Sequence, residues 1–148
     1  MSITLEDLKA IGSRCAGVRT LMTARTVARL FDQQMKQVGL TGTQFTLLVA
    51  IGSRQFGSIS ELGQTLCIEK STLSRNLRPL IEDGLIERDT KSTGRAIVHR
   101  LTSEGEARLK AAYPIWQGVQ DGLEDKLGVD EVRDGYRFMA KLRHAAMA

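Results

Sequence analysis

The sequence is poor in cysteine and in long apolar runs. Its 2 cysteines, Cys15 and Cys67, have no paired spacing, so a disulfide framework or a C-x-x-C redox or zinc motif is not indicated. No apolar run approaches the roughly 20 residues that a membrane-spanning helix needs, and the first residues show no signal-peptide pattern. We therefore expect a protein of the reducing cytoplasm that has no membrane partner.

Groups that support catalysis are also scarce. The 2 histidines, His99 and His144, do not lie at metal-ligand spacing from another histidine, a cysteine or a carboxylate pair. The sequence has no glycine-rich phosphate loop, and no nucleophile, base and orienting group can be named together. It therefore predicts a protein that is not an enzyme and holds neither a metal nor a cofactor. We expect His99 to be a half-buried strand residue.

Aromatic residues make up only 5% of the chain and prolines number 2, whereas apolar residues make up 42%. This composition favours helices, and the length suits a single domain over residues 1–148. Lysine and arginine number 21 against 17 acidic residues, for a net charge of +4. Such a balance permits nucleic-acid binding without demanding it.

The first third of the chain has a helical apolar pattern. From Leu5 to about Val38, apolar residues recur three or four positions apart with a small change of phase, which predicts one long helix or two joined by a bend. Cys15 lies on this stripe and is read first as a small buried hydrophobic residue. A thiol sensor is the alternative, because Arg14 and Arg19 nearby would favour the thiolate.

The middle of the chain predicts two helices joined by a tight turn. The T-x-x-Q pattern at Thr41 and the S-x-x-E pattern at Ser58 each mark the start of a helix. A turn over 67–69, in which we expect Cys67 to serve packing, leads into a helix over 70–81. This arrangement is typical of a helix-turn-helix.

The two sides of the 70–81 helix differ in chemistry. One side carries Leu73, Leu77, Leu80 and Ile81, and the other carries Ser71, Arg75 and Arg78 with Thr72 and Ser74 beside them. Lys70, at the start of the helix, is a further candidate DNA contact. Hydroxyl and guanidinium donors on such a helix suit the major groove of DNA, where arginine binds guanine through two hydrogen bonds. A solvated basic surface is the alternative. Pro79 is expected on the outward side, where it shapes the helix.

A hairpin is expected to follow this helix. Gly84 predicts its end, and Leu85 to Arg88 and Arg95 to Leu101 predict two short strands around a polar turn. A basic loop directly behind a helix-turn-helix suits the minor groove, with Lys91 and Arg95 as the candidate contacts. The predicted fold is therefore mainly α with a small β-hairpin wing (α+β), a winged helix-turn-helix.

The remaining chain predicts two more helices. Ser103 to Glu106 has the form of a capping box that opens a helix kinked at Pro114 and closed by Gly128, and Asp130 opens the last helix. An apolar stripe of Ile115, Trp116, Val119 and Leu123 lies on the first of these helices. Core or dimer packing is its simpler interpretation, and a ligand pocket is the alternative.

Several segments, in order, resemble the MarR family of bacterial winged-helix regulators over nearly the whole chain. They are Gly39 to Thr41, Gln44 to Leu48, Ser60 to Gly63, Ser71 to Leu77, Leu80 to Glu87, Arg95, and Arg100 to Gly105. Two positions depart from the family pattern. Thr93 stands where many members have an Asp that supports the wing arginine, and Glu69 replaces a shorter cap before the recognition helix.

The resemblance implies how the chain assembles and what it binds. Residues 1–38 and 103–148 would form the N- and C-terminal dimerisation helices of a homodimer, and residues 39–102 the DNA-binding lobe. Ser71, Thr72, Ser74, Arg75 and Arg78 would lie on the recognition helix, and Arg95 would be the wing arginine. The partners implied are double-stranded DNA with a pseudo-palindromic site and a small, often aromatic or acidic ligand held between the dimer helices and this lobe.

Three functions remain open at this point. The first is a repressor that a small effector releases from its operator. The second is a redox-sensing regulator that acts through Cys15, as cysteine oxidation controls some relatives. The third is a winged-helix module that binds other proteins and no DNA, and it predicts no salt-dependent DNA binding.

Overall fold

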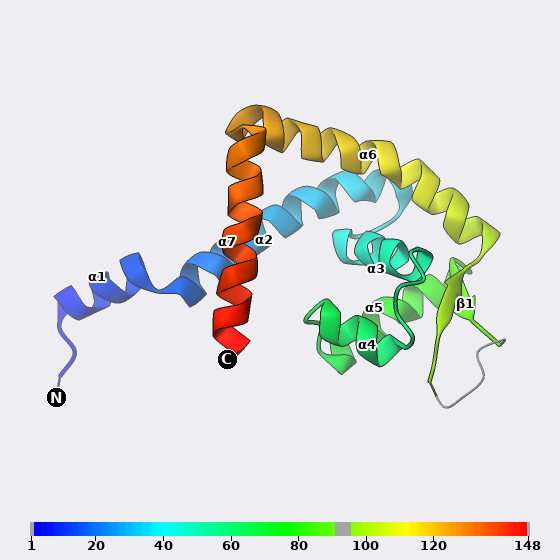
Figure 1. The fold of residues 1–148 in the computed structure, drawn as a ribbon, viewed down its shortest axis with the longest axis horizontal. Coiled ribbons are helices and arrows are strands. Elements are labelled where there is room, and N and C mark those ends of the chain that lie inside the picture. The colour runs from blue at the N-terminus through cyan, green and yellow to red at the C-terminus, as the bar shows by residue number, and fades with distance from the viewer. Residues whose placement is uncertain (1, 91–95, 148) are drawn as a thin grey trace.

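The computed structural model describes residues 2–90 and 96–147. The elements, in chain order, are α1 (Leu5–Arg14), α2 (Ala16–Met35), the 3-10 turn η1 (Lys36–Val38), α3 (Gly42–Gly52), α4 (Ile59–Thr65), α5 (Lys70–Glu82), β1 (Ile86–Arg88), β2 (His99–Leu101), α6 (Ser103–Leu127) and α7 (Val129–Met147). The long helices α2 and α6 pack on each other, with α3 to α5 and the two strands on one side of them, and α1 projects away from this lobe (Figure 1). The predicted mainly helical fold with a small hairpin is confirmed.

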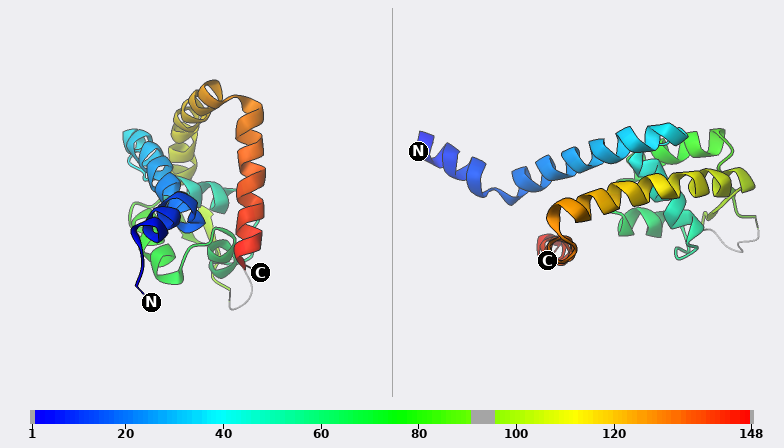
Figure 2. Two further views of the ribbon diagram at one scale, coloured as in Figure 1. Left: turned by 90° about the vertical axis from the view of Figure 1, so that its left-hand side faces the viewer. Right: turned by 90° about the horizontal axis from the view of Figure 1, so that it is seen from above.

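The N-terminal stripe forms two helices joined by a bend at Cys15. The backbone of Cys15 is extended there, with φ −68° and ψ 111°, although its N–H still donates to the carbonyl of Ile11. A single extended residue is enough to redirect a helix. Of the two expected arrangements, the bent pair is therefore the one found, and Figure 2 shows α1 and the start of α2 reaching beyond the other helices.

Local signals in the sequence fix the start of α3. The hydroxyl of Thr41 accepts a hydrogen bond from the Gln44 N–H at 3.1 Å, and the Gln44 side chain accepts one from the Thr41 N–H at 2.9 Å. Asp32 on α2 also accepts from the Gly42 N–H at 2.7 Å. The predicted capping box is confirmed, and the hydrogen bond between Gly42 and Asp32 fixes the start of α3 against α2.

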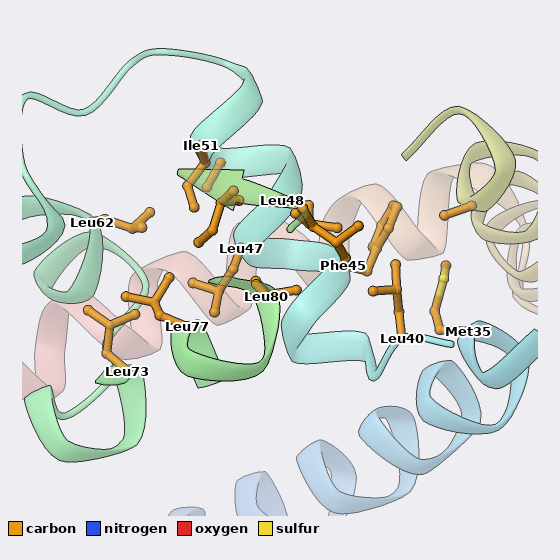
Figure 3. Packing of buried hydrophobic residues seen from close by; sticks show 14 residues of the cluster. Met35, Leu40, Phe45, Leu47, Leu48, Ile51, Leu62, Leu73, Leu77 and Leu80 are labelled. Carbon is orange, nitrogen blue, oxygen red and sulfur yellow. The ribbon is translucent and has the colours of Figure 1, made fainter. Parts of the chain in front are cut away.

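The hydrophobic core centres on α3 (Figure 3). Leu47, Leu48 and Ile51 on this helix pack against Leu77 and other apolar residues of the surrounding elements. The remaining buried members are Met35, Leu40, Phe45, Ala50, Leu62, Leu73, Leu80, Leu85, Ile86 and Ala112. Burying several such side chains at about 1.5–3 kcal/mol each makes this cluster the main stabilising contribution to the lobe.

The helical wheel is wrong for one residue of α5. Ile81 was expected with Leu73, Leu77 and Leu80, but its side chain is 47% exposed while those three are buried. Ile81 lies next to the end of the helix, where Gly84 takes a left-handed φ of 68° and turns the chain into β1. The core face of α5 therefore ends at Leu80.

The hairpin is shorter than predicted on its second strand. β1 and β2 pair antiparallel with Ile86 opposite Leu101 and Arg88 opposite His99, so the second strand begins at His99. The carbonyl of Ile97 accepts a hydrogen bond from the Ile59 N–H at 2.9 Å, at the start of α4. Ile97 therefore binds the start of α4, a long-range contact that strand periodicity does not reveal.

The start of α6 differs by one residue from the prediction. The N-cap is Thr102, whose hydroxyl accepts from the Gly105 N–H at 3.0 Å and donates to the carbonyl of Gly84 at 2.5 Å. Ser103 is already the first helical residue, so the predicted Ser103 capping box is wrong. Thr102 is the N-cap because its hydroxyl also satisfies a carbonyl at the end of α5.

Replacing Thr102 with Val is expected to lower the free energy of unfolding by about 1–2 kcal/mol, because both hydrogen bonds of the hydroxyl are lost. Ser103→Ala, which removes the hydroxyl predicted from the sequence, should change stability by less than about 0.5 kcal/mol. Urea unfolding monitored by circular dichroism compares the two variants. If Ser103→Ala lost more stability than Thr102→Val, Ser103 and not Thr102 would be the N-cap.

The last two helices meet at Gly128, which has a left-handed φ of 89°. α7 begins at Val129, one residue before the predicted start, and the Gln120 side chain donates to the Tyr136 hydroxyl at 3.0 Å between the two helices. Pro114 lies inside α6, which is visibly curved in Figure 1. In residues 2–90 and 96–147, no helix is long and apolar enough to cross a membrane.

Candidate nucleic-acid interface

Helix α5 is held against the lobe by one side and presents the other to solvent. Leu73, Leu77 and Leu80 are buried against α3 and α4. All six predicted DNA contacts of this helix are exposed: Lys70, Ser71, Thr72, Ser74, Arg75 and Arg78. The structure therefore brings the predicted donors together on one accessible surface, which we call the α5 polar face. Pro79, expected to point outward, is half-buried.

The members of the α5 polar face differ in how far they are already engaged. Arg78 donates from Nε to Glu82 Oε1 at 2.7 Å, and this bonded carboxylate raises the pKa of Arg78. No ion pair or hydrogen bond engages the Arg75 side chain within the described part of the chain. Arg75 is therefore free to bind a base edge or a phosphate. Arg78 must either break its ion pair with Glu82 to bind DNA or bind DNA with its remaining N–H groups.

The N-terminus of α5 lacks a side-chain cap. Glu69 occupies the N-cap position, and its carboxylate makes no capping hydrogen bond. This agrees with the expectation that a longer acid caps less well than aspartate. The first backbone N–H groups of α5 therefore keep their capacity to bind an anion such as a phosphate.

The hairpin beside α5 adds basic residues at its base. Arg88 ends β1 and is exposed, and Arg100 on β2 pairs with Glu87 at 2.7 Å. The predicted wing contacts Lys91 and Arg95, and the departure at Thr93, lie outside the described residues. Arg88 was not singled out from the sequence, because one arginine at the end of a short strand gives no distinguishing signal.

His99 is half-buried, as predicted, at the start of β2. Burial lowers its pKa, and the nearby positive charge of Arg88 lowers it further, so the ring is neutral at pH 7. Its Nδ1 atom is buried and has no hydrogen-bond partner among the described residues. In the same part of the chain, no three histidine, cysteine, aspartate or glutamate residues gather where they could hold a metal ion.

Comparisons with known proteins agree with this geometry. Residues 40–105 match a family model described as a winged helix DNA-binding domain. An uncharacterized HTH-type transcriptional regulator of Bacillus cereus is 30% identical over 115 residues, which cover 77% of each protein. The crystal structure of the transcriptional regulator MosR of M. tuberculosis is 34% identical, with a TM-score of 0.77, over 90% of this chain and 96% of that one. The chain belongs to the MarR family.

Similar MarR-type structures include complexes with DNA. MosR in complex with DNA is 31% identical, with a TM-score of 0.75, over 91% of this chain and 100% of that one. A MarR mutant from E. coli complexed with operator DNA is 23% identical, with a TM-score of 0.76, over 90% of this chain and 96% of that one, and it supports the fold alone. This MarR-family chain is a DNA-binding transcriptional regulator.

The two cysteines of this MarR-family chain lie in different surroundings from those expected. Cys15 is half-buried at the bend between α1 and α2, and its stripe neighbours Ile11, Val18 and Met22 are exposed, so the chain by itself does not bury this stripe. Cys67 is exposed with a φ of 54°, so the packing role expected for it is wrong. A redox role for Cys15 stays a prediction.

An open groove of about 440 Å³ runs between α2 and α6. Leu30 on α2 and Ile115, Val119 and Leu123 on α6 line it. The fourth residue of the predicted stripe, Trp116, packs against the core, as Ile115 also does, and lies beside Tyr113 with ring centroids 5.6 Å apart. The predicted stripe therefore contacts both the core and the exposed groove between α2 and α6.

Proposed function

We propose that this MarR-family regulator is a homodimeric repressor that grips a pseudo-palindromic operator and leaves it when a small effector binds. The observation that carries the proposal is the α5 polar face. Its donors lie on a helix whose opposite side is fixed in the core, so they keep one arrangement relative to the lobe. Positioned donors of this kind suit base-edge readout in the major groove.

Each part of the surface has its own role in this proposal. Arg75 reads a base, since it is exposed and free of other partners within the described part of the chain. Lys70 and the hydroxyls of Ser71, Thr72 and Ser74 bind phosphates or base edges at the start of the helix. Lys91 and Arg95 enter the minor groove from the wing, where the negative potential attracts cations.

The dimer is supported by apolar side chains that the single chain leaves exposed. None of the described residues of α1 or α7 is buried. Exposed apolar residues on α1, α2 and α7 include Leu5, Leu8, Ile11, Val18, Leu21, Met22, Val27, Tyr136, Phe138, Met139 and Met147. Apolar surface of this extent marks an interaction site. A two-fold dimer would set the two α5 helices about 34 Å apart, one turn of DNA.

The alternative of a module that binds only proteins fits the α5 polar face less well. Protein-binding surfaces are organised around aromatic or aliphatic anchors that fill pockets. The predicted contacts on the α5 polar face are hydroxyls and cations, and the apolar residues of the helix lie on its other side, except Ile81 near its end. This composition supports DNA as the partner of α5 and leaves the apolar helices for the second subunit.

Phe138→Glu is expected to dissociate the dimer and to weaken operator binding at least tenfold at nanomolar protein, because it places a charge on the unburied apolar surface of α7. Sedimentation equilibrium gives the oligomeric state, and fluorescence anisotropy with the DNA upstream of the protein's own gene gives the affinity. Thr43→Glu, which adds the same charge at an exposed position on α3, is the control. A wild-type protein that sediments as a monomer while it binds this DNA tightly would contradict the dimer.

A further inference from the structure

The ring of His99 lies where the start of α4 meets the hairpin of β1 and β2. Just before it in the chain, the carbonyl of Ile97 accepts a hydrogen bond from the Ile59 N–H of α4 at 2.9 Å. The carbonyl of Val98 accepts one from the Asp89 N–H at 2.8 Å and so holds the open end of the hairpin. Both acceptors lie within two residues of His99, so a movement of its ring acts directly on this junction.

The surroundings of the His99 ring favour its neutral form. The ring lines a small cavity together with the apolar side chains of Ile51, Phe56 and Ile59. Its Nδ1 atom is buried without a hydrogen-bond partner among the described residues. Protonation makes both ring nitrogens donors. It would therefore bury a charged donor that has no acceptor, which costs more free energy than an unpaired neutral atom.

The charged groups near the ring add to this cost. Burial lowers the pKa of His99, and the positive charge of Arg88, its partner across the ladder, lowers it further. The charged side chains of the cavity wall, among the described residues, are Arg54, Asp89 and Arg100. Arg100 is already paired with Glu87, and α4 contributes only uncharged residues to this wall. Positive charge therefore exceeds negative charge around the ring before it is protonated.

We propose that His99 makes this junction sensitive to acid, such that protonation of its ring separates α4 from the hairpin and frees the hairpin to move relative to α5. The closed junction binds fewer protons than the open one, so acid shifts the population towards the open one. The closed junction keeps its full stability above the ordinary histidine pKa of about 6.5 and loses stability as the pH falls below it. Operator binding weakens over the same range. That consequence rests on the proposed function, whereas the opening itself does not.

Hydrogen exchange followed in ¹H–¹⁵N spectra of the full chain without DNA tests the opening. Between about pH 7.5 and pH 5, the protection factors of the Ile59 and Asp89 amides should fall at least threefold beyond the intrinsic change in exchange rate. The protection factor of Leu48, in the middle of α3, should stay constant. The ring signals of His99 should titrate over the same range as these two amides, which ties the opening to this histidine in the wild type itself.

Two variants should change this transition in different ways. His99→Gln, whose side chain is polar but does not titrate, should abolish the loss of Ile59 protection in acid. Arg88→Gln removes the nearby positive charge, so the transition should move to higher pH. The control is His144→Gln, which removes the other histidine, on exposed α7, and should behave as the wild type does.

Three outcomes would overturn the proposal. They are constant protection of Ile59 in acid, the same loss of protection in His99→Gln, and an equal loss at Leu48, which would mean that the whole lobe opens. Anisotropy at both pH values then tests regulation, and the operator affinity of the wild type relative to His99→Gln should fall at least threefold in acid. A constant ratio would overturn the link to DNA. A junction that opens through His99 in a protein that binds no operator at either pH would refute the proposed function and leave the acid-sensitive junction standing.

Discussion

Arg75→Ala is expected to weaken binding to the operator at least tenfold and to reduce its preference over an unrelated duplex. A bidentate contact from arginine to guanine contributes about 1–3 kcal/mol of discrimination, and the proposed two-fold dimer would lose it in both half-sites. The variant should keep its fold, because Arg75 is exposed and makes no hydrogen bond or ion pair within the described part of the chain. Fluorescence anisotropy with both duplexes over a range of salt concentrations measures the change.

The salt series separates readout from general attraction. If Arg75 contacts a base, the affinity for the operator falls while the affinity for the unrelated duplex changes little. If it contacts a phosphate, both affinities fall and the salt dependence becomes shallower. Arg133→Ala removes the same charge from exposed α7 and should leave both affinities unchanged. An Arg75→Ala protein that binds both duplexes as the wild type does would exclude this residue from the interface.

Gly105→Ala is expected to lower the free energy of unfolding by about 3 kcal/mol or more. A Cβ atom on Gly105 would lie 2.0 Å from the backbone oxygen of Leu85, far inside van der Waals contact. Overpacking commonly costs 1–3 kcal/mol, and here the clash is with backbone that cannot rotate away. The N–H of Gly105 also donates to Thr102, so moving α6 outward would weaken its N-cap as well.

Urea unfolding of Gly105→Ala against Ala107→Ser separates this clash from a general effect on the helix. Ala107 is exposed on the same turn of α6, and its replacement should change stability by less than about 0.5 kcal/mol. If Gly105→Ala were as stable as the wild type, the close approach of α6 to Leu85 would be absent in solution. A loss of similar size in both variants would point to a general sensitivity of this turn of α6 and not to the clash, since alanine is a better helix former than glycine.

The sequence predicted best where a signal is local. Thr41 and Gln44 lie three residues apart, and the two hydrogen bonds between them begin α3 without help from the rest of the chain. Leu73, Leu77 and Leu80 repeat with the helical period, so the opposite side of α5 had to face away from the core. Ser71, Thr72, Ser74, Arg75 and Arg78 are exposed for this reason, whereas Lys70 is exposed as the first residue of the helix.

Predictions failed where a hydrogen bond to a backbone group far away in the sequence determines where a helix or strand begins. Thr102 displaces Ser103 as the N-cap because its hydroxyl also reaches the carbonyl of Gly84, and Ile97 leaves the strand because it binds Ile59. Spacing along the chain contains none of these contacts.

The hydrogen bond from Thr102 to Gly84, together with the close approach of Gly105 to Leu85, couples the start of α6 to the end of α5. The turn that ends α5 is fixed to the first turn of α6, so a tilt of α6 carries α5 with it. α6 has 25 residues, and at 1.5 Å per residue it is about 37 Å long. A tilt of about 5° at its far end therefore moves α5 by roughly 3 Å, close to the rise of one base pair of about 3.4 Å. In the proposed dimer, small rotations between the two subunits would thus become changes of register on the double helix.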